Sequence, residues 1–421
     1  MKIAVVGLGY VGLPLALEFA CSGADVLGLD IDLVKVKALN EGRSYIGHIP
    51  SEEIQGQLAA KRFQASAEFF LVREMDAVVI CVPTPLTKNR EPDLSYILQT
   101  GEAMAPHLKK GCLVVLESTT YPGTTEDDLR VVLEKKSGMV AGKDFFLAFS
   151  PERCDPGNPA IRLRSIPKVV GGFTPACLER AKALYASIVE RVVPVSSCRV
   201  AEAAKLLENI FRSVNIALVN ELKVAFTKMG IDIWEVIEAA KTKPFGFMPF
   251  YPGPGWGGHC IPIDPFYLTW KARECGATTR FIELAGEINT VMQDFVVNRV
   301  AEALNNFGKP LKGARILLLG LAYKANVDDD RESPSYILME KLEEKGARVS
   351  YHDPFIPVIR PSRQHSRFAG RLSTLISEDF DLLLIATAHD AFKKIDFTRF
   401  KIPIVDTRNL IPTPLTNLYK A

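Results

Sequence analysis

The sequence predicts an α/β protein in which two doubly wound domains are joined by a long central helix. Short runs rich in β-branched residues alternate with helical stretches over the first two hundred residues. A long helical pattern follows, and the alternation restarts at Ala314. Alternation of this kind is typical of a parallel sheet with helices on both faces. At roughly 150 residues per domain, a chain of 421 residues favours two or three domains.

The first α/β region is expected to contain a series of short strands. They cover Lys2–Val6, Asp25–Leu29, Asp76–Val82, Leu113–Glu117, Phe145–Phe149, Lys168–Val170 and Arg191–Val195. Prolines 83, 85, 122 and 151 come just after strands, and proline cannot continue a hydrogen-bonded ladder. They mark loops at the carboxyl ends of the strands, the edge at which doubly wound folds hold a ligand.

The middle of the chain is predicted to be helical. A helix of about 30 residues extends from Val200 to Met229 and is ended by Gly230. Shorter helices are expected over Asp232–Lys241 and Ile282–Asn306. The apolar residues of the long helix share a broad face, made of Ala203, Leu206, Leu207, Ile210, Phe211, Val214 and Leu218. Such a face favours packing against a second chain, and packing between the flanking domains is the alternative.

The second α/β region resembles the first in outline. Its expected strands are Arg315–Leu319, Ala347–Tyr351, Asp381–Ala386 and Pro403–Val405. The segment NNFGKPLKG near residue 307 is a natural boundary. We therefore predict domains at residues 1–196, 197–306 and 307–421.

Composition excludes several classes of protein. Hydrophobic residues make up 48% and charged residues 24%, which argues against intrinsic disorder. A net charge of +2 gives no reason to expect nucleic acid or an anionic membrane as partner. The apolar run Ile3–Leu17 is too short for a membrane span. With no secretion signal and no CxxC pair among eight cysteines, we expect a cytoplasmic protein with reduced thiols and no metal.

A GxGxxG motif follows the first strand and opens a helix. Gly7 permits a tight turn, Gly9 lets the backbone approach a pyrophosphate, and Gly12 lets helix and strand pack closely. The pyrophosphate binds the amides of this turn, which also contains Tyr10 and Val11, at the helix N-terminus. The motif predicts a Rossmann-like dinucleotide site, and a glycine-rich turn without a ligand is the alternative.

Asp30 indicates which dinucleotide binds. It ends the second strand, 18 residues after Gly12. An acid at this place hydrogen-bonds the ribose hydroxyls and repels a 2′-phosphate, so we predict NAD rather than NADP. In the second α/β region only Gly320 remains of the motif, which argues against a second NAD site.

Cys260 lies in an unusual stretch. Between Pro252 and Pro265 it is surrounded by four glycines and four prolines. Asp264 followed by Pro265 predicts a helix start, which places Cys260 just ahead of a helix N-terminus, where a thiolate is stabilised. A packed turn around a buried, inert thiol is the alternative.

Several motifs together resemble the UDP-glucose/GDP-mannose dehydrogenase superfamily over essentially the whole chain. They are GLGYVGLPLA, CVPTP, ESTTYPGTT, SPER, AEAAKLLEN, GGHCIPIDP and YKANVDDDRESP. Members oxidise the C6 hydroxymethyl of a nucleotide sugar to a carboxylate with two NAD. The resemblance implies an NAD-binding Rossmann-like domain, a central region with the dimerisation helix and the catalytic cysteine loop, and a UDP-sugar-binding domain.

The resemblance also implies catalytic roles. Cys260 is the nucleophile that forms a thiohemiacetal and then a thioester. Lys205 and Asn209, four residues apart on the long helix, surround the reacting oxygen. Asp264 assists proton transfer with water, and Glu152 and Thr119 handle the hydrolytic water and a proton relay. Without the motifs, each polar residue here would be interpreted as a solvated helix or loop position.

Further contacts are carried over from the same motifs. Thr84, together with Glu117 or Ser118, lies in loops that border the nicotinamide. The remaining carried-over residues are Lys35 beside the adenosine, Arg331 near the cofactor phosphates, and Arg153, Tyr251, Gly257 and Lys324 as sugar-nucleotide contacts, in addition to Glu152, Lys205 and Asn209.

The choice of sugar rests on departures from the UDP-glucose pattern. Ile263 replaces the lysine of GGxCxPKDP, and HCIPIDP resembles the branch acting on UDP-N-acetylhexosamines. The run PFGFMPFY resembles the members that act on UDP-N-acetylglucosamine more than those that act on UDP-N-acetylmannosamine, whereas Cys154 stands where the resemblance leads us to expect a charged residue. The same reaction on UDP-N-acetylmannosamine or UDP-glucose is the nearest alternative. A two-electron alcohol dehydrogenase, which needs no cysteine, and a non-catalytic nucleotide-sugar binder are further alternatives.

Overall fold

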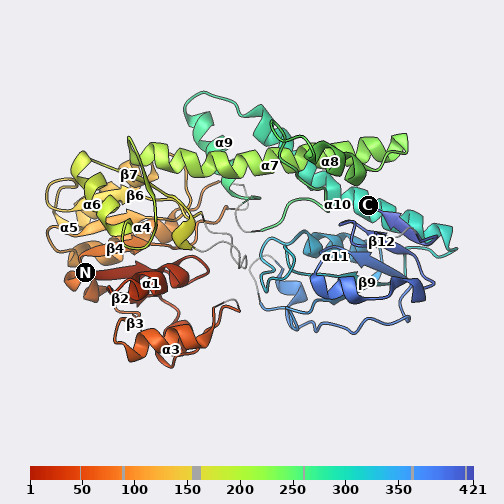
Figure 1. Cartoon of the computed structure of the whole chain (residues 1–421), viewed down its shortest axis with the longest axis horizontal. Coiled ribbons are helices and arrows are strands. Elements are labelled where there is room, and N and C mark those ends of the chain that lie inside the picture. The colour runs from red at the N-terminus through yellow and green to blue at the C-terminus, as the bar shows by residue number, and fades with distance from the viewer. Residues whose placement is uncertain (48, 88–90, 154–162, 259–260, 362–364, 413–414) are drawn as a thin grey trace. The chain divides into compact units, whose positions relative to one another are not determined.

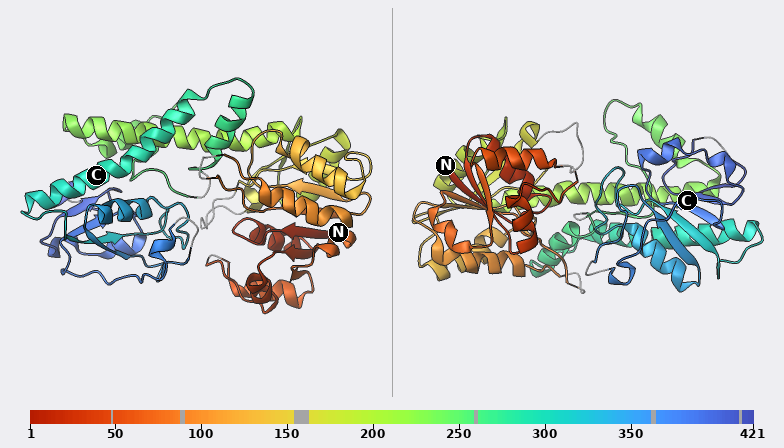
Figure 2. Two further views of the ribbon diagram at one scale, coloured as in Figure 1. Left: turned by 180° about the vertical axis from the view of Figure 1, so that it is seen from behind. Right: turned by 90° about the horizontal axis from the view of Figure 1, so that it is seen from below.

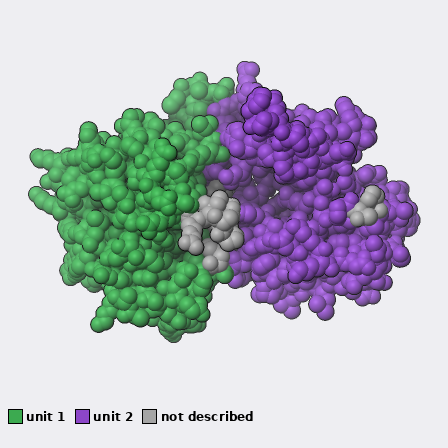
Figure 3. Space-filling model, in the orientation of Figure 1, with its two compact units in different colours: residues 1–208, 266–278 green, residues 209–265, 279–421 purple. Residues whose placement is uncertain are grey.

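The computed structural model describes residues 1–421 except 48, 88–90, 154–162, 259–260, 362–364 and 413–414. The described residues form two compact units (Figure 3). Unit 1 comprises residues 1–208 and 266–278, and unit 2 comprises residues 209–265 and 279–421. Within these residues, no helix combines the length and the apolar character that crossing a membrane requires.

Unit 1 contains an eight-stranded sheet of order β3-β2-β1-β4-β5-β6-β7-β8 (Figure 1). Its strands are β1 Lys2–Val6, β2 Asp25–Leu29, β3 Phe63–Ser66, β4 Ala77–Ile80, β5 Leu113–Leu116, β6 Phe146–Phe149, β7 Lys168–Gly172 and β8 Val192–Val195. Its helices include α1 Gly12–Cys21, α2 Leu33–Asn40, α3 Ser51–Ala59, α4 Ser95–Met104, α5 Arg130–Ser137 and α6 Pro175–Tyr185. The strand order reverses between β1 and β4, which is the switch point at which such folds bind ligands.

The sheet of unit 1 is buried on both faces because its central strands are apolar throughout. In β1, Ile3 and Val5 pack into one hydrophobic cluster, and Ala4 and Val6 pack into another on the opposite face. All four side chains are at most 2% exposed. A strand with no polar face requires helices on both sides, which is the doubly wound arrangement predicted from the sequence.

One pair of strands departs from the predicted parallel sheet. β6 and β7 are antiparallel, with Ala148 opposite Gly172 and Phe149 opposite Gly171. A parallel connection needs a crossover, usually a helix, and the segment between β6 and β7 re-enters the sheet at the edge it left. Residues 150–153, which follow β6, therefore lie at the ligand edge.

The central helix α7, Cys198–Met229, is continuous over 32 residues and passes from unit 1 into unit 2 (Figure 1). The residues of its predicted broad apolar face are partly buried and partly exposed in the structure. Leu206 is buried, whereas Leu207, Phe211 and Leu218 are 67%, 47% and 51% exposed. The buried side of α7 also carries polar residues, namely Glu202, Asn209, Ser213, Asn220 and Lys223.

Unit 2 contains a five-stranded parallel sheet of order β10-β9-β11-β12-β13. Its strands are β9 Arg315–Leu319, β10 Arg348–His352, β11 Leu382–Ile385, β12 Ile404–Asp406 and β13 Leu418–Lys420. Its helices include α8 Ile233–Lys241, α10 Arg280–Asn306 and α11 Pro334–Glu344. The unit 2 part of α7 packs on α10 (Figure 2). At this contact the Asn220 amide donates to Asn289 Oδ1 at 2.8 Å.

The two sheets and the long helix confirm the predicted fold class. The expected strands and the three central helices are present with small shifts of their ends. β3 and β13 were not predicted, because each is a short strand at the edge of its sheet, with four and three residues. The helix predicted after Cys260 is α9, Asp264–Glu274, of which residues 266–274 belong to unit 1.

Candidate active site

The glycine turn after β1 has the geometry of a phosphate-binding turn. Gly7 has φ +90°, and a Cβ on it would lie 2.6 Å from the carbonyl oxygen of Cys81. A Cβ on Gly12 would lie 1.9 Å from the carbonyl oxygen of Gly7. In the described part of the chain, a Cβ on Gly9 would meet no atom within 4 Å. Gly7 and Gly12 are thus required by packing, whereas the space beside Gly9 is open to a ligand.

The start of α1 fits an anionic ligand. Val11 is the N-cap residue, preceded by Tyr10, and among the described residues no side chain caps this terminus. The unpaired amides of a first helical turn and the helix dipole favour a phosphate. The turn therefore fits the pyrophosphate of NAD.

Asp30 lies beside this turn at the end of β2 and is 8% exposed. Its two oxygens accept hydrogen bonds from the backbone amides of Leu8, at 2.8 Å, and Asp32, at 2.9 Å. Lys35 Nζ lies 3.7 Å from Asp30 Oδ2. The carboxylate is therefore fixed beside the glycine turn with Lys35 next to it, and the contacts of both residues with the adenosine remain predictions.

Thr84 lies in the loop that leaves β4, next to the glycine turn. The Cα of Val82 in this loop is 3.3 Å from the Cβ position of Gly7. Thr84 is 5% exposed. Because β4 and β1 flank the switch point, this loop borders the cofactor edge of the sheet.

In unit 1, the SPER loop after β6 is attached to α7. Lys205 Nζ donates to the carbonyl oxygen of Glu152 at 2.5 Å. Arg153 forms an ion pair of 2.8 Å with Glu208 and donates to the carbonyl oxygen of Pro167. The structure therefore brings Lys205, Glu152 and Arg153 together. Thr119 lies in the neighbouring loop after β5 and is half-buried.

In unit 2, Asn209 and Asp264 are in contact. The Asn209 amide donates to Asp264 Oδ2 at 2.5 Å, and the two residues are 4% and 3% exposed. Lys205 precedes Asn209 by one turn of α7. Cys260 and Cys154 lie outside the described residues, so the position of the predicted nucleophile is not among these contacts.

The glycines that precede Cys260 are packed against unit 2. Gly255 has φ +105°, and a Cβ on it would lie 2.5 Å from Gln293 Nε2. A Cβ on Gly257 would lie 2.9 Å from Pro334 Cδ and 3.2 Å from Tyr323 Cβ. Packing within unit 2 requires these glycines, and the role of Gly257 as a substrate contact remains a prediction.

The other predicted contacts in unit 2 have partners of their own. Tyr251 donates to Glu238 at 2.6 Å and stacks on Trp234, with ring centroids 5.7 Å apart. Arg331 forms a two-point contact with Asp329, at 2.8 and 2.6 Å. Lys324 is half-buried in the turn after β9. These residues remain predicted ligand contacts.

Two residues that hold the site were not singled out from the sequence. Glu202 accepts hydrogen bonds from the amides of Gly123 and Thr125 in the loop after Thr119. Tyr267 on α9 donates to the carbonyl oxygen of Thr84. Glu202 stands three residues before Lys205 in AEAAK, and this spacing is the only sequence signal for it.

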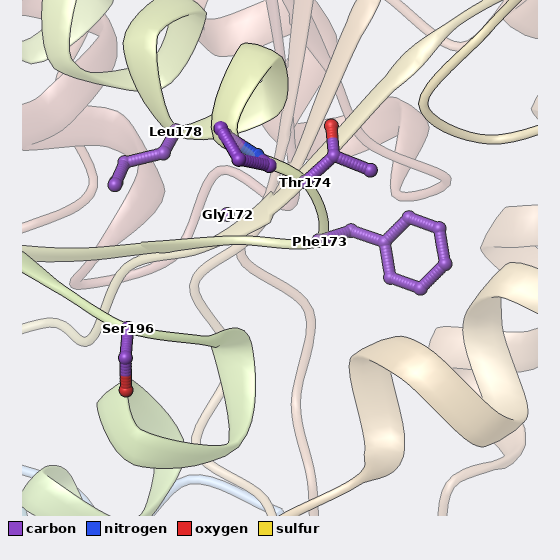
Figure 4. Close-up of a pocket in the computed structure, with 6 residues that line it drawn as sticks. Gly172, Phe173, Thr174, Leu178 and Ser196 are labelled. Atoms are coloured by element: carbon purple, nitrogen blue, oxygen red, sulfur yellow. The ribbon is translucent and has the colours of Figure 1, made fainter.

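A small cavity in unit 1 is separate from these residues. It has a volume of about 130 Å³ and lies where Thr174 caps α6 (Figure 4). Its lining consists of Gly172, Phe173, Thr174, Pro175, Leu178 and Ser196. It contains no predicted site residue.

Three domain models of one family match the chain in order. They describe the UDP-glucose/GDP-mannose dehydrogenase family: the NAD binding domain over residues 1–189, the central domain over 199–291 and the UDP binding domain over 317–413. The first of these models is an NAD binding domain, and it contains the glycine turn whose geometry fits NAD.

Relatives match over nearly the whole chain. A UDP-N-acetyl-D-glucosamine 6-dehydrogenase of Pseudomonas aeruginosa is 38% identical over 396 residues, 94% of this chain and 92% of that protein. A UDP-N-acetyl-D-mannosamine dehydrogenase of Pyrococcus horikoshii is 36% identical, over 98% of this chain and 97% of that protein. A solved structure of the UDP-N-acetylmannosamine dehydrogenase from P. horikoshii has a TM-score of 0.90 at 34% identity, covering 100% of this chain and 98% of that one. The chain therefore belongs to the UDP-glucose/GDP-mannose dehydrogenase family and is an NAD-dependent nucleotide-sugar dehydrogenase.

Proposed function

We propose that the protein oxidises the C6 hydroxymethyl of UDP-N-acetylglucosamine to a carboxylate, in the cytoplasm, for the synthesis of a surface polysaccharide. The P. aeruginosa relative, at 38% identity, supports this sugar. UDP-N-acetylmannosamine is the nearest alternative because the P. horikoshii relative is 36% identical, and UDP-glucose is the next.

The contact that carries the proposal is the hydrogen bond between Asn209 and Asp264. Asp264 follows Cys260 by four residues in the chain. The bond therefore attaches the segment that carries the thiol to the helix that carries Lys205. A nearly buried carboxylate bonded to an amide, four residues from a cysteine, suits proton transfer during thiol chemistry.

In the first half of the proposed reaction, Lys205 and Asn209 stabilise negative charge on the C6 oxygen as it loses its proton. When bound, NAD accepts a hydride from C6 in each of the two oxidations. The aldehyde carbon is then attacked by the Cys260 thiolate, and the new C–S bond gives a thiohemiacetal.

In the second half, loss of a hydride from the thiohemiacetal gives a thioester. Water attacks the thioester carbon, the C–S bond breaks, and the thiolate of Cys260 leaves. Asp264 takes a proton from that water, while Glu152 and Thr119 orient it and relay protons. Two NAD are consumed for each sugar.

We assign cofactor binding, the cysteine loop and sugar binding to the three domains predicted from the sequence. Residues 1–196 bind NAD through Gly7, Gly9, Tyr10, Val11, Gly12, Asp30, Lys35 and Thr84, with Arg331 near the phosphates. Residues 197–306 carry α7 and the cysteine loop. Residues 307–421 bind the nucleotide sugar through Lys324, together with Arg153, Tyr251 and Gly257.

We also propose a homodimer formed through α7. Leu207, Phe211 and Leu218 are exposed on one stripe of the helix, with Val200 at 44% exposure extending it. Contiguous apolar residues on a helix face in solvent favour association with another helix. A second copy of the chain offers the same stripe, as a two-fold interface requires.

The experiment that tests the proposal measures NADH formed per UDP-N-acetylglucosamine consumed, for the wild-type protein and for Cys260→Ala. We expect a ratio near two, and no sustained two-step turnover by the variant. A ratio near one with an active Cys260→Ala protein would indicate a two-electron alcohol dehydrogenase. Faster turnover of UDP-N-acetylmannosamine or UDP-glucose would reassign the sugar, and binding without turnover of any of them would indicate a binding protein.

A further inference from the structure

Tyr267 is a buried residue of α9 whose hydroxyl reaches the loop after β4. The side chain is 0% exposed. Its hydroxyl lies 2.8 Å from the carbonyl oxygen of Thr84 and 3.2 Å from that of Pro85. All three residues belong to unit 1. The phenol therefore donates to the backbone of the loop that borders the cofactor edge of the sheet.

Side-chain hydroxyls contribute to the shape of the first part of this loop. Pro83 and Pro85 have no backbone N–H, so the loop cannot form a regular ladder with a neighbouring strand. Two of its carbonyl oxygens accept hydrogen bonds from hydroxyls outside the loop: Ser118 Oγ donates to Val82 at 2.7 Å, and Tyr267 donates to Thr84. A buried carbonyl left without a donor is costly, so each hydroxyl contributes to the position of the loop.

The loop in turn contacts the glycine turn. The missing Cβ of Gly7 would lie 2.6 Å from the carbonyl oxygen of Cys81 and 3.3 Å from the Cα of Val82. No side chain fits between the two segments, so a shift of the β4 loop changes the phosphate-binding turn beside it. Thr84 follows Val82 by two residues.

Aromatic packing fixes the ring of Tyr267 from the other side. Tyr121, in the loop after β5, lies 6.4 Å from Tyr267 and 5.1 Å from Trp270 between ring centroids. The Tyr121 hydroxyl points elsewhere and donates to Asp128 at 2.9 Å. α9 thus contacts the loops that leave β4 and β5. The Tyr267 hydroxyl donates to the carbonyl oxygen of Thr84, whereas the carbonyl oxygen of Pro85 also accepts from the backbone amide of Asp93 at 3.0 Å.

We propose that Tyr267 is a positioning residue for NAD: it holds the carbonyl of Thr84, and with it the cofactor loop, in the geometry that binding requires. This inference rests on the proposed function, which places the Thr84 loop beside the nicotinamide of NAD. Tyr267 follows Cys260 by seven residues, so one short segment connects the thiol to this hydrogen bond. In the proposed reaction the second hydride transfer takes place while the sugar is held on the thiol, so the cofactor loop has to keep its place during that step, and the Tyr267 hydroxyl provides a fixed donor for it.

The test is Tyr267→Phe, which removes one hydroxyl and leaves the aromatic packing. We expect KM for NAD, and the Kd of NAD measured by calorimetry without sugar, to rise about fivefold to tenfold, with kcat within twofold. KM for the UDP-sugar stays unchanged. Tyr121→Phe is the matched control: it removes a neighbouring hydroxyl that is bonded to Asp128, and NAD affinity stays within twofold of wild type.

Two results would overturn the inference. One is an unchanged NAD affinity in Tyr267→Phe, with or without a lower Tm, which would make the hydroxyl a packing element. The other is an equal loss in Tyr121→Phe, which would mean that the aromatic cluster as a whole matters and the bond to Thr84 does not. Because NAD binding is measured without sugar, a failed four-electron stoichiometry would refute the proposed oxidation and leave this result standing.

Discussion

At the scale of single residues, we expect Asp30 to determine the choice of cofactor, because two backbone hydrogen bonds fix its carboxylate. Its Oδ2 accepts from Leu8 and its Oδ1 from Asp32, so both oxygens are fixed beside the glycine turn. A 2′-phosphate would meet this fixed charge, and like charges held together cost several kcal/mol. We expect kcat/KM for NAD to exceed that for NADP by roughly 100-fold or more.

Asp30→Asn tests this interpretation. An amide oxygen can accept from only one of the two backbone N–H groups, and the repelling charge is gone. The NAD/NADP ratio of kcat/KM is expected to fall by about tenfold. Asp32→Asn is the control, because Asp32 caps α2 and asparagine caps as well, so the ratio should not change. A ratio that is insensitive to Asp30→Asn would exclude Asp30 as the discriminating group.

A buried ion pair in unit 1 fixes the same edge of the sheet. Lys168 Nζ lies 2.8 Å from Glu117 Oε2, with side chains 8% and 0% exposed, and also donates to the carbonyl oxygen of Pro151. Tyr185 donates to the other oxygen of Glu117. Burial raises the pKa of Glu117, and the charge of Lys168 offsets part of that rise. The pair joins the loops that contain Thr119 and Glu152.

Removing one member of this pair should be more harmful than removing both. Lys168→Met leaves a buried carboxylate without its cation and is expected to lower the free energy of unfolding by about 3–5 kcal/mol. The double variant Glu117→Gln/Lys168→Met should recover most of this loss. Lys182→Met, which breaks the exposed pair with Glu179, serves as control and should cost under about 1 kcal/mol. Denaturant unfolding measures all three, and equal losses in the single and double variants would contradict the expectation.

At the scale of elements, the segment after Thr119 is an irregular helix held by α7. Gly123 has φ +112°, and Thr124–Leu129 form a π-helix, a rare element that is often found at functional sites. Glu202 of α7 accepts from the amides of Gly123, at 2.6 Å, and Thr125, at 2.9 Å, and from the Thr125 hydroxyl at 2.7 Å. This carboxylate attaches the π-helix to the helix that carries Lys205.

Glu202 should make stability depend on pH near neutrality. Desolvation by burial raises its pKa from 4.5 to about 7, although the three hydrogen bonds oppose the rise. The folded state therefore binds a proton more tightly than the unfolded state, and its contribution is fully present below pH 4.5 and lost as the pH rises to about 7. The loss amounts to on the order of 3 kcal/mol.

Glu202→Gln removes this titration. Between pH 5 and 8, the free energy of unfolding of the wild-type protein should fall more steeply than that of the variant, whose curve lacks the Glu202 contribution. Glu221→Gln, an exposed position on the same helix, should keep the wild-type slope. Parallel curves for wild type and Glu202→Gln would show that the carboxylate does not titrate in this range.

At the scale of the whole molecule, the proposed dimer depends on the exposed stripe of α7. Leu207→Glu combined with Leu218→Glu places charges on that stripe and should convert a dimer into a monomer, because burying unpaired charges in an interface is unfavourable. Arg212→Glu, on another face of the helix, should leave the mass unchanged. Sedimentation velocity reports the mass of each variant, and a wild-type monomer would refute the proposal outright.

Much of the fold could be predicted because its cause is local. The runs Lys2–Val6 and Asp25–Leu29 are strands because nearly every side chain in them is apolar, and α7 ends at Gly230, which has φ +72°. The glycine turn could be located from the GxGxxG motif, because the space around Gly7 and Gly12 excludes any Cβ. The antiparallel β6–β7 pair was missed, because strand direction depends on the route of the connecting chain and not on strand composition.

The sequence by itself therefore determined the two α/β regions, the central helix, the glycine turn and the motifs that place the chain in its family. These features depend on residue type and spacing along one segment. The tertiary structure alone decided which distant groups meet: Lys205 with the Glu152 carbonyl, Asn209 with Asp264, and Tyr267 with Thr84. Each of these contacts joins residues more than fifty positions apart in the chain. The periodicity of a sequence does not specify such pairs, because the packing of buried apolar faces brings the two segments together.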